Sequence, residues 1–237
     1  MSDADRTPDA SEPTSAAGRA PAPSDRARVR RLPERAAYER EQVCAILDEG
    51  FVCHLGFAGR DGRPVVIPTT YGRDGDTVYV HGSPAAGMVR SLKGGLDASL
   101  AVTLVDGLVL ARSAFHHSIN YRSVVLFGTA REVTEPAEKA RALDVIVEHI
   151  VPGRLAGLRP NTTKEVAATS VLALGLDEAS AKVRTGPPVD DAEDMDAPIW
   201  AGVLPMALRP GDPVADVANT APLPDHVARY HRPGTAS

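Results

Sequence analysis

The sequence predicts a mainly β protein, an antiparallel β-barrel with a few helices at its periphery. Short apolar runs rich in β-branched and aromatic residues recur along the chain, and turns containing Gly and Asp separate them, as in successive hairpins. Helical patterns are few and do not alternate regularly with the strand patterns. A doubly wound parallel sheet is therefore not expected, and the chain has neither a GxGxxG nor a GxxxxGKS/T motif.

Composition narrows the class of protein. Of the 237 residues, 43% are hydrophobic, which is enough for a sizeable core. A net charge of −5 and an aromatic content of 4% argue against nucleic acid as a partner. Apolar runs fall far short of the roughly 20 residues that cross a bilayer, and the N-terminus lacks an apolar signal segment. We expect a cytoplasmic protein without membrane association. Cys44 and Cys53 form no disulfide framework and no metal-binding pattern.

Three segments are expected along the chain. Residues 1–27 are rich in Ala, Pro and Ser without periodic apolar positions, so they predict a disordered tail. Residues 28–206 carry the strand and helix patterns and form the predicted domain. Residues 207–237 form a Pro-rich C-terminal extension.

The first half of the domain is predicted to be one helix followed by strands and tight turns. Apolar residues at helical spacing, ended by Gly50, predict a helix over 33–50. Strands are expected over 51–57, 64–71 and 77–82, with turns at 59–62 and 73–76. A short helix is expected over 84–93.

The second half adds strands around one long helix. Strands are expected over 98–105 and 108–113, joined by a hairpin at Asp106-Gly107, and over 121–133. A helix is expected to begin at Thr134-Glu135-Pro136, with Pro near its first position. Further strands are expected over 172–176, 180–184 and 199–204.

A turn where a strand passes into a helix is the first candidate site. His81-Gly82-Ser83 offers a hydroxyl and backbone N–H groups, and unpaired N–H groups at a helix start favour anions. Arg90 and Lys93, three residues apart, lie on neighbouring parts of one helical face. The pattern indicates a phosphate pocket, and the alternative is an ordinary solvated helix with cations near its end.

A polar cluster precedes the long strand. Residues 115–123 include His116, His117, Asn120, Tyr121, Arg122 and Ser123, which could hydrogen-bond the polar edge of a planar ring. Adjacent histidines on a strand point to opposite faces, so they would not chelate one ion together. A plain polar loop entering a strand is the alternative.

A proline lies within one predicted strand. Pro68 removes a ladder donor, so its strand is expected at an edge or interrupted, where backbone groups become available to a ligand. A simple edge strand is the alternative. Trp200, the one tryptophan, could cover a ligand or belong to the core, and His54 is interpreted as structural.

Taken in order, five segments resemble the pyridoxamine 5′-phosphate oxidase-like superfamily of flavoproteins. They are VVIPTTY, VYVHGSPAAGMVRSLK, SINYRSVVLFGTAREV, KVRTGPPVDD and PIWAGVLPM. Within the superfamily the chain is most similar to flavin-nucleotide-binding proteins related to nitroimidazole-resistance reductases, over about 29–206. The resemblance implies an FMN-binding split β-barrel and a homodimer with the cofactor at the subunit interface.

The resemblance also implies roles for individual residues. Val66, Ile67, Pro68, Thr69 and Thr70 would lie along the flavin ring and ribityl chain. His81, Ser83 and Arg90, with Lys93, would hold the phosphate. Asn120, Tyr121, Arg122 and Ser123 would approach the cofactor, and Trp200 would lie near the pocket. His81 also matches a histidine near the flavin in the nitroimidazole-resistance group, so it is the candidate catalytic residue.

The implied function is an FMN-dependent oxidoreductase that reduces a small organic acceptor, nitroaromatic or quinone-like. Arg122 is the candidate cation that stabilises the reduced flavin. The chain lacks the C-terminal substrate motif of true pyridoxamine phosphate oxidases, so oxidation of vitamin B6 is not expected. The alternatives are a non-catalytic flavin- or haem-binding protein, in which His116 or His117 is an axial ligand, and a deazaflavin in place of FMN.

Overall fold

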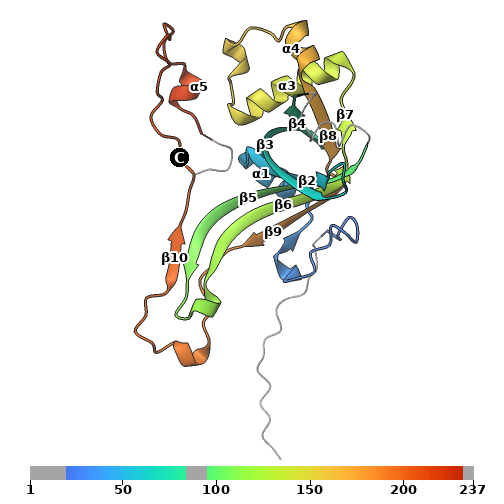
Figure 1. Cartoon of the computed structure of the whole chain (residues 1–237). Helices are drawn as coiled ribbons and strands as arrows, with labels where there is room; N and C mark the ends of the chain where they lie inside the picture. The colour runs from blue at the N-terminus through green and yellow to red at the C-terminus, as the bar shows by residue number, and fades with distance from the viewer. Residues whose placement is uncertain (1–19, 84–94, 232–237) are drawn as a thin grey trace, which may run out of the picture.

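Ten strands form one antiparallel sheet in the computed structural model, which describes residues 20–83 and 95–231. The strand order is β1-β9-β6-β5-β2-β3-β4-β8-β7, and β10 pairs with the far end of β5 (Figure 1). The sheet curls into a barrel, with α1 and α3 beside it. The predicted fold class, mainly antiparallel β with flanking helices in a split barrel, is confirmed.

The strands and helices have the following bounds. The strands are β1 (Ala36–Ala37), β2 (Val52–Ala58), β3 (Pro64–Asp74), β4 (Thr77–Gly82), β5 (Asp97–Leu110), β6 (Ser118–Thr129), β7 (Arg131–Glu132), β8 (Ser170–Gly175), β9 (Glu178–Arg184) and β10 (Gly202–Pro205). The α-helices are α1 (Arg40–Glu49), α3 (Pro136–Ile150), α4 (Thr163–Ala168) and α5 (Asp225–Ala228). The short 3-10 turns in the described parts of the chain are η1 (Pro33–Arg35), η2 (Ala114–His116), η3 (Leu155–Gly157) and η4 (Ala192–Asp194).

Alternate residues of the central strands fill the barrel. In β2, Cys53, Leu55 and Phe57 are buried, and the residues between them face the opposite side of the sheet. We call this opposite side the outer face. The apolar side of α1 joins the same core through Val43, Ile46 and Leu47.

The helix α3 packs against a second, smaller core on the far side of β3 and β4. Ala142 and Ile146 from α3 meet Tyr79, Val171 and other buried residues there. Close approach depends on Gly72 in β3, because a Cβ at this position would lie 2.7 Å from Ile146 Cα. Only glycine therefore lets α3 lie so near the sheet.

The strand β3 changes partners halfway along its length. Residues 64–70 pair with β2, whereas residues 71–74 pair with β4 on the opposite edge. The edge of 64–70 that points away from β2 has no strand partner in the described parts of the chain. The prediction from Pro68 that this strand is an edge is confirmed. The open edge is limited to residues 64–70, because residues 71–74 pair with β4.

The hairpin predicted at Asp106-Gly107 is wrong. The chain continues through this dipeptide as one strand, β5, and a bulge shifts its register with β6 between Val105 and Gly107. Both edges of residues 107–109 are paired, with β6 on one side and β10 on the other, so no turn is needed. Glycine suits the bulge because a Cβ on Gly107 would lie 3.2 Å from Leu204 O.

The first helix begins later than predicted, whereas the long second helix begins where the sequence predicts it, with Pro136 at its first position. The first helix begins at Arg40, because Ala36 and Ala37 form β1 and pair with Lys182 and Ala181 of β9. The second begins after Glu135, whose carboxylate caps it by accepting hydrogen bonds from the Ala137 and Glu138 N–H groups. The strand predicted over 121–133 is divided, because β7 leaves β6 and pairs with β8.

The segments beside the domain also make contacts. Arg26 Nε donates to Glu178 Oε2 at 2.7 Å, and Ala27 is only 2% exposed. From the C-terminal extension, Tyr230 Oη donates to Ile150 O at 2.8 Å. The helix predicted over 84–93 lies outside the described residues. Among the described helices, none is long and apolar enough to cross a membrane.

Beyond the barrel, the far ends of β5 and β6 extend together with β10 (Figure 1). We call residues 105–120 and 185–206 the arm. Its tip contains η2 and η4, which an ion pair between His116 and Asp191 connects. The arm thus brings segments about 75 residues apart into contact.

Candidate functional site

The open edge of β3 presents a defined set of backbone groups. Gly59 N donates to Arg63 O at 2.7 Å, so these two residues form a hydrogen-bonded pair at the end of the β2–β3 ladder. Hydrogen-bonded pairs alternate along an antiparallel ladder, and the odd-numbered residues of β3 are therefore the ones bonded to β2. The even-numbered residues 64, 66, 68 and 70 therefore turn their N–H and C=O groups to the open edge. Pro64 and Pro68 have no N–H, so Val66 and Thr70 supply the donors while all four residues supply carbonyls.

Side chains along this segment divide between the two faces. Val66 is 65% exposed, and Pro68 is exposed with it on the outer face. Ile67 and Thr69 alternate with them and are partly buried. The segment predicted to lie along the flavin thus offers an apolar surface and an open backbone edge together.

The strand β4 separates from β3 where this edge begins. Tyr71 of β3 pairs with Val80 of β4. His81, which follows Val80 in β4, pairs only with Val171 of β8. We call the junction formed by 66–70 and 81–83 the fork. His81 Nδ1 is buried there and has no hydrogen-bond partner among the described residues. Burial lowers the pKa of His81, so its imidazole is neutral near pH 7.

The fork therefore joins several of the predicted site residues. Val66, Ile67, Pro68, Thr69 and Thr70 form one side, His81 lies at the junction, and exposed Ser83 follows it. Arg90 and Lys93, predicted for the phosphate, lie outside the described residues.

The predicted cluster on β6 divides between the two faces of its strand. Asn120, only 8% exposed, donates to Gly186 O at 3.1 Å and accepts from Arg184 Nη1. Tyr121 pairs in register with Val105, and Ser123 Oγ donates to Lys182 O at 3.3 Å. Asn120 has a clear structural role, because it fixes the turn that follows β9.

Two carboxylates hold the guanidinium of Arg122. It donates to both oxygens of Asp106, at 2.7 and 2.9 Å, and to both oxygens of Glu49. Hydrogen bonds to Asp106 and then Glu49 raise the pKa of Arg122. Its charge is compensated within the chain, and it ties α1 to the bulge of β5.

The arm carries Trp200, which is 67% exposed. Its ring lies over Gly202, where a Cβ would be 2.9 Å from the ring carbons. The predicted site residues therefore form two groups, one at the fork and one along β6 and the arm.

One exposed residue of the outer face was interpreted as structural from the sequence. His54 lies between Pro68 of β3 and Ala101 of β5, and its side chain is exposed. The signal was present in FVCHLGF, since strict alternation with buried Cys53 and Leu55 places His54 on the other face.

The two arm histidines differ in their bonding. His116 Nε2 lies 3.0 Å from Asp191 Oδ2, and this hydrogen bond raises the pKa of His116. His117 Nδ1 lies 2.8 Å from Ser113 O. Because a carbonyl only accepts, Nδ1 of His117 is the donor in this hydrogen bond and carries a proton.

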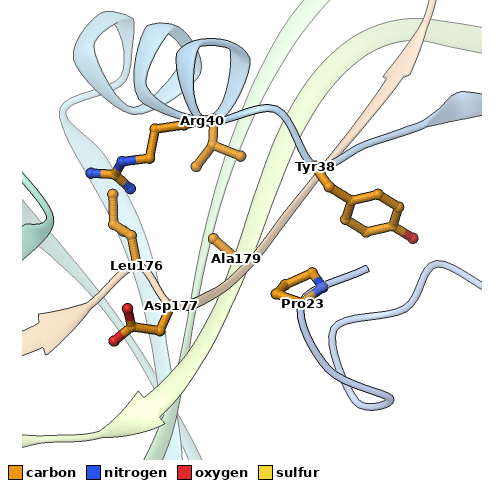
Figure 2. Close-up of a pocket in the computed structure, with 7 residues that line it drawn as sticks. Pro23, Tyr38, Arg40, Leu176, Asp177 and Ala179 are labelled. Carbon is orange, nitrogen blue, oxygen red and sulfur yellow. The ribbon is translucent and has the colours of Figure 1, made fainter. Parts of the chain in front are cut away.

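Other polar groups were considered as metal or ligand sites. Within residues 20–83 and 95–231, no group of three or more His, Cys, Asp or Glu side chains is arranged to hold a metal ion. A pocket beside α1 is lined by Pro23, Tyr38, Arg40, Val43, Leu176, Asp177 and Ala179 (Figure 2). Its volume of about 80 Å³ is far below that of a pocket for a nucleotide cofactor.

Solved structures similar to this chain bind flavin and haem according to their descriptions. The flavocytochrome Anf3 from Azotobacter vinelandii is 44% identical with a TM-score of 0.81, and the match covers 87% of this chain and 96% of Anf3. The FAD and haem binding protein from Mycobacterium smegmatis is 40% identical with a TM-score of 0.77, covering 81% of this chain and 95% of that one.

A more distant structure shares the fold. A 5-nitroimidazole antibiotic resistance protein, described as putative, from Bacteroides thetaiotaomicron is 22% identical with a TM-score of 0.54, over 62% of this chain and 86% of its own. No curated protein matches the chain. Residues 39–183 match the family described as pyridoxamine 5′-phosphate oxidase, which is more than half of the sequence. The split barrel, the open edge of β3 and these matches together show that the chain belongs to the pyridoxamine 5′-phosphate oxidase family.

Proposed function

We propose that this protein binds a flavin nucleotide, FMN or FAD, at the fork and acts as a flavin-dependent oxidoreductase. The observation that carries the proposal is made on the described residues: the edge of β3 over 64–70 has no strand partner, and the buried Nδ1 of the adjacent His81 has no hydrogen-bond partner. A buried polar atom without a partner is costly, so a ligand that supplies one would be stabilised there.

The donors and acceptors of the fork suit the polar rim of a flavin ring. That rim alternates carbonyl oxygens with an N–H group, and the edge of β3 alternates the Val66 and Thr70 N–H groups with carbonyls. Exposed Val66 and Pro68 provide apolar contact for a flat aromatic ring. A bound flavin supplies hydride and single-electron transfer, while the protein orients it.

The proposed assignments for the phosphate remain those of the sequence. Ser83 is the last residue of the fork, Arg90 and Lys93 come after it in the sequence, and the three residue types suit a phosphate. The proposed acceptor is a small nitroaromatic or quinone-like molecule, and His81, neutral at the fork, is the group proposed to contact it. Arg122 is proposed to hold α1 and β5 in position near the site through its ion pairs with Glu49 and Asp106.

A homodimer is proposed with this function. Apolar side chains are exposed on the outer face, including Val52 at 42%, Val66 at 65% and Val105 at 44%. Exposed apolar patches of this kind mark interaction surfaces. A second copy seated on the outer face would bury them close to the fork.

Cofactor binding tests the proposal directly. The purified protein should be yellow, and mass spectrometry of the released cofactor should identify FMN or FAD. His81→Ala should weaken flavin binding about tenfold, the value of one lost hydrogen bond in a buried site. His231→Ala, in the C-terminal extension, is the matched control and should bind flavin normally. A colourless protein that fails to bind added FMN or FAD would overturn the proposal.

A second candidate function is electron transfer between the flavin and a haem. The descriptions of two relatives, 44% and 40% identical, name flavin together with haem or cytochrome. The chain itself offers His117, an exposed histidine whose Nδ1 bonds Ser113 O and whose Nε2 is the nitrogen that would bind haem iron. Haem titration should give a Soret band, and turnover with nitroaromatic or quinone acceptors distinguishes the first function from the second.

A further inference from the structure

The outer face of the barrel carries one ionisable side chain next to the surface proposed for the flavin. On this face, the described residues of 52–58, 64–70 and 99–105 present aliphatic, small or hydroxyl side chains, and His54 of β2 is the exception. Histidine is the side chain that most often transfers protons in enzymes. His54 is therefore the one group in this patch that is suited to proton transfer.

The β2–β3 ladder places His54 directly beside Pro68. The two residues pair, and the odd-numbered residues of β3 are the ones bonded to β2, so this is a non-hydrogen-bonded pair. The Cβ atoms of such a pair are about 4.5–5.5 Å apart, at the close end of that range. On its other side His54 pairs with Ala101 of β5, which is small. The imidazole thus adjoins a flat ring that rests on Val66 and Pro68.

The imidazole of His54 is not engaged within the protein. Its side chain is exposed, and none of the described residues is hydrogen-bonded to its ring. His81 at the fork differs, because burial lowers its pKa and keeps its ring neutral. A neutral imidazole is a very weak acid, so His81 is suited to contact an acceptor but not to protonate it.

We propose that His54 is the catalytic acid that protonates a quinone-type acceptor on the outer face, beside the flavin. This inference rests on the proposed function and adds a residue to the same site. Reduction of a quinone to a hydroquinone takes up one hydride, which carries two electrons, and one proton. The hydride comes from the reduced flavin, which is thereby oxidised. An N–H bond of protonated His54 breaks, an O–H bond of the hydroquinone forms, and the imidazole regains its proton from water.

Binding of p-chlorophenol tests the contact without turnover, because a phenol has the hydroxyl of the product and is not reduced. Titration of the full-length, flavin-loaded protein should change the flavin absorption spectrum. His54→Ala should raise the Kd about tenfold, the value of one lost hydrogen bond. His231→Ala, in the C-terminal extension, is the matched control and should keep the wild-type Kd. An unchanged Kd in His54→Ala would show that His54 does not reach the acceptor, and the proposal would be wrong.

Reoxidation of the dithionite-reduced protein, followed by stopped flow, separates proton transfer from electron transfer. With menadione, a quinone, His54→Ala should react about 100-fold more slowly than the wild type, and added imidazole should restore part of the rate. With ferricyanide, which takes one electron and no proton, the two proteins should react equally fast. His54→Gln keeps a polar side chain without an acid and should resemble His54→Ala. Equal slowing with both oxidants would assign His54 a structural role and overturn the proposal.

The possible failures remain distinguishable. If the wild-type protein binds no flavin, the proposed function fails and this inference with it. If the wild type carries flavin but does not reduce menadione, the quinone-type acceptor is wrong and so is the role of His54. If the wild type reduces menadione and His54→Ala does so at the same rate, only the assignment to His54 is overturned. Equal flavin content in all variants shows that each is folded.

Discussion

At the scale of single residues, the buried thiol of Cys53 shows how the barrel core affects ionisation. Cys53 is fully buried between the sheet and α1. Burial raises its pKa from 9.0 to about 12, because the thiolate would lose its hydration in an apolar core. The thiol is therefore a core side chain and a poor nucleophile at neutral pH.

This shift predicts a loss of stability in alkaline solution. Above about pH 9 the unfolded chain releases the Cys53 proton, whereas the folded chain keeps it until about pH 12. The free energy of unfolding should therefore fall between these values, by up to about 1.4 kcal/mol per pH unit, and be unaffected below them. Urea unfolding across this pH range should show a shallower pH dependence in Cys53→Ala.

The other cysteine provides the control for this measurement. Cys44→Ala is the matched control, because it removes a thiol that is only partly buried on α1 and leaves the contribution of Cys53 in place. Equal slopes in wild type and Cys53→Ala would contradict the prediction. Differences in slope are the useful quantity, since each substitution also changes packing.

At the scale of elements, the contact between α3 and β3 depends on one missing side chain. Gly72→Ala would place a Cβ within 2.7–2.9 Å of Ile146 and Val145 backbone atoms. Because backbone atoms cannot rotate away, α3 would have to move from the sheet. We expect the free energy of unfolding to fall by about 2–3 kcal/mol, measured by urea denaturation.

Another strand glycine is the matched control for this substitution. A Cβ on Gly128 of β6 meets no atom within 4 Å, so Gly128→Ala should change stability by less than about 0.5 kcal/mol. Similar losses for the two variants would show that the effect belongs to strand glycines in general rather than to the contact with α3.

Also at this scale, the elements show what local sequence can and cannot predict. The strand β2 and the turn at 73–76 depend on local sequence, and both predictions are confirmed. The bulge at Asp106 was predicted as a hairpin, because Asp-Gly suits either structure and only pairing with β6 and β10 decides. The fork was partly predictable, since Pro68 indicated an edge, but its extent depends on where β4 leaves β3.

The candidate site could be predicted from local sequence to an even smaller extent. The sequence predicted His116 and His117 as alternatives without a preference. They are distinguished by Ser113 O, four residues away, and by Asp191, 75 residues away. Arg122 is held by Glu49, another distant residue. Such partners come together only through the tertiary fold, so local patterns cannot reveal them.

At the scale of the whole molecule, the exposed outer face predicts association. The chain has a mass of 25.0 kDa, so light scattering after size exclusion should give about 50 kDa for the proposed dimer. Val52→Asp places a charge on the outer face and should yield the monomer mass. Val214→Asp is the control, because Val214 is 94% exposed in the C-terminal extension. A wild-type monomer at micromolar concentration would contradict the proposed assembly.

The two prolines of β3 have a consequence for the solubility of the folded chain. An unpaired strand edge can recruit strands from other molecules and begin aggregation. Along residues 64–70, Pro64 and Pro68 remove two of the four N–H groups that an incoming strand would need. The edge is thus a poor template for another polypeptide, although it remains open to a small planar ligand. No additional segment is required to cover it and prevent fibre growth.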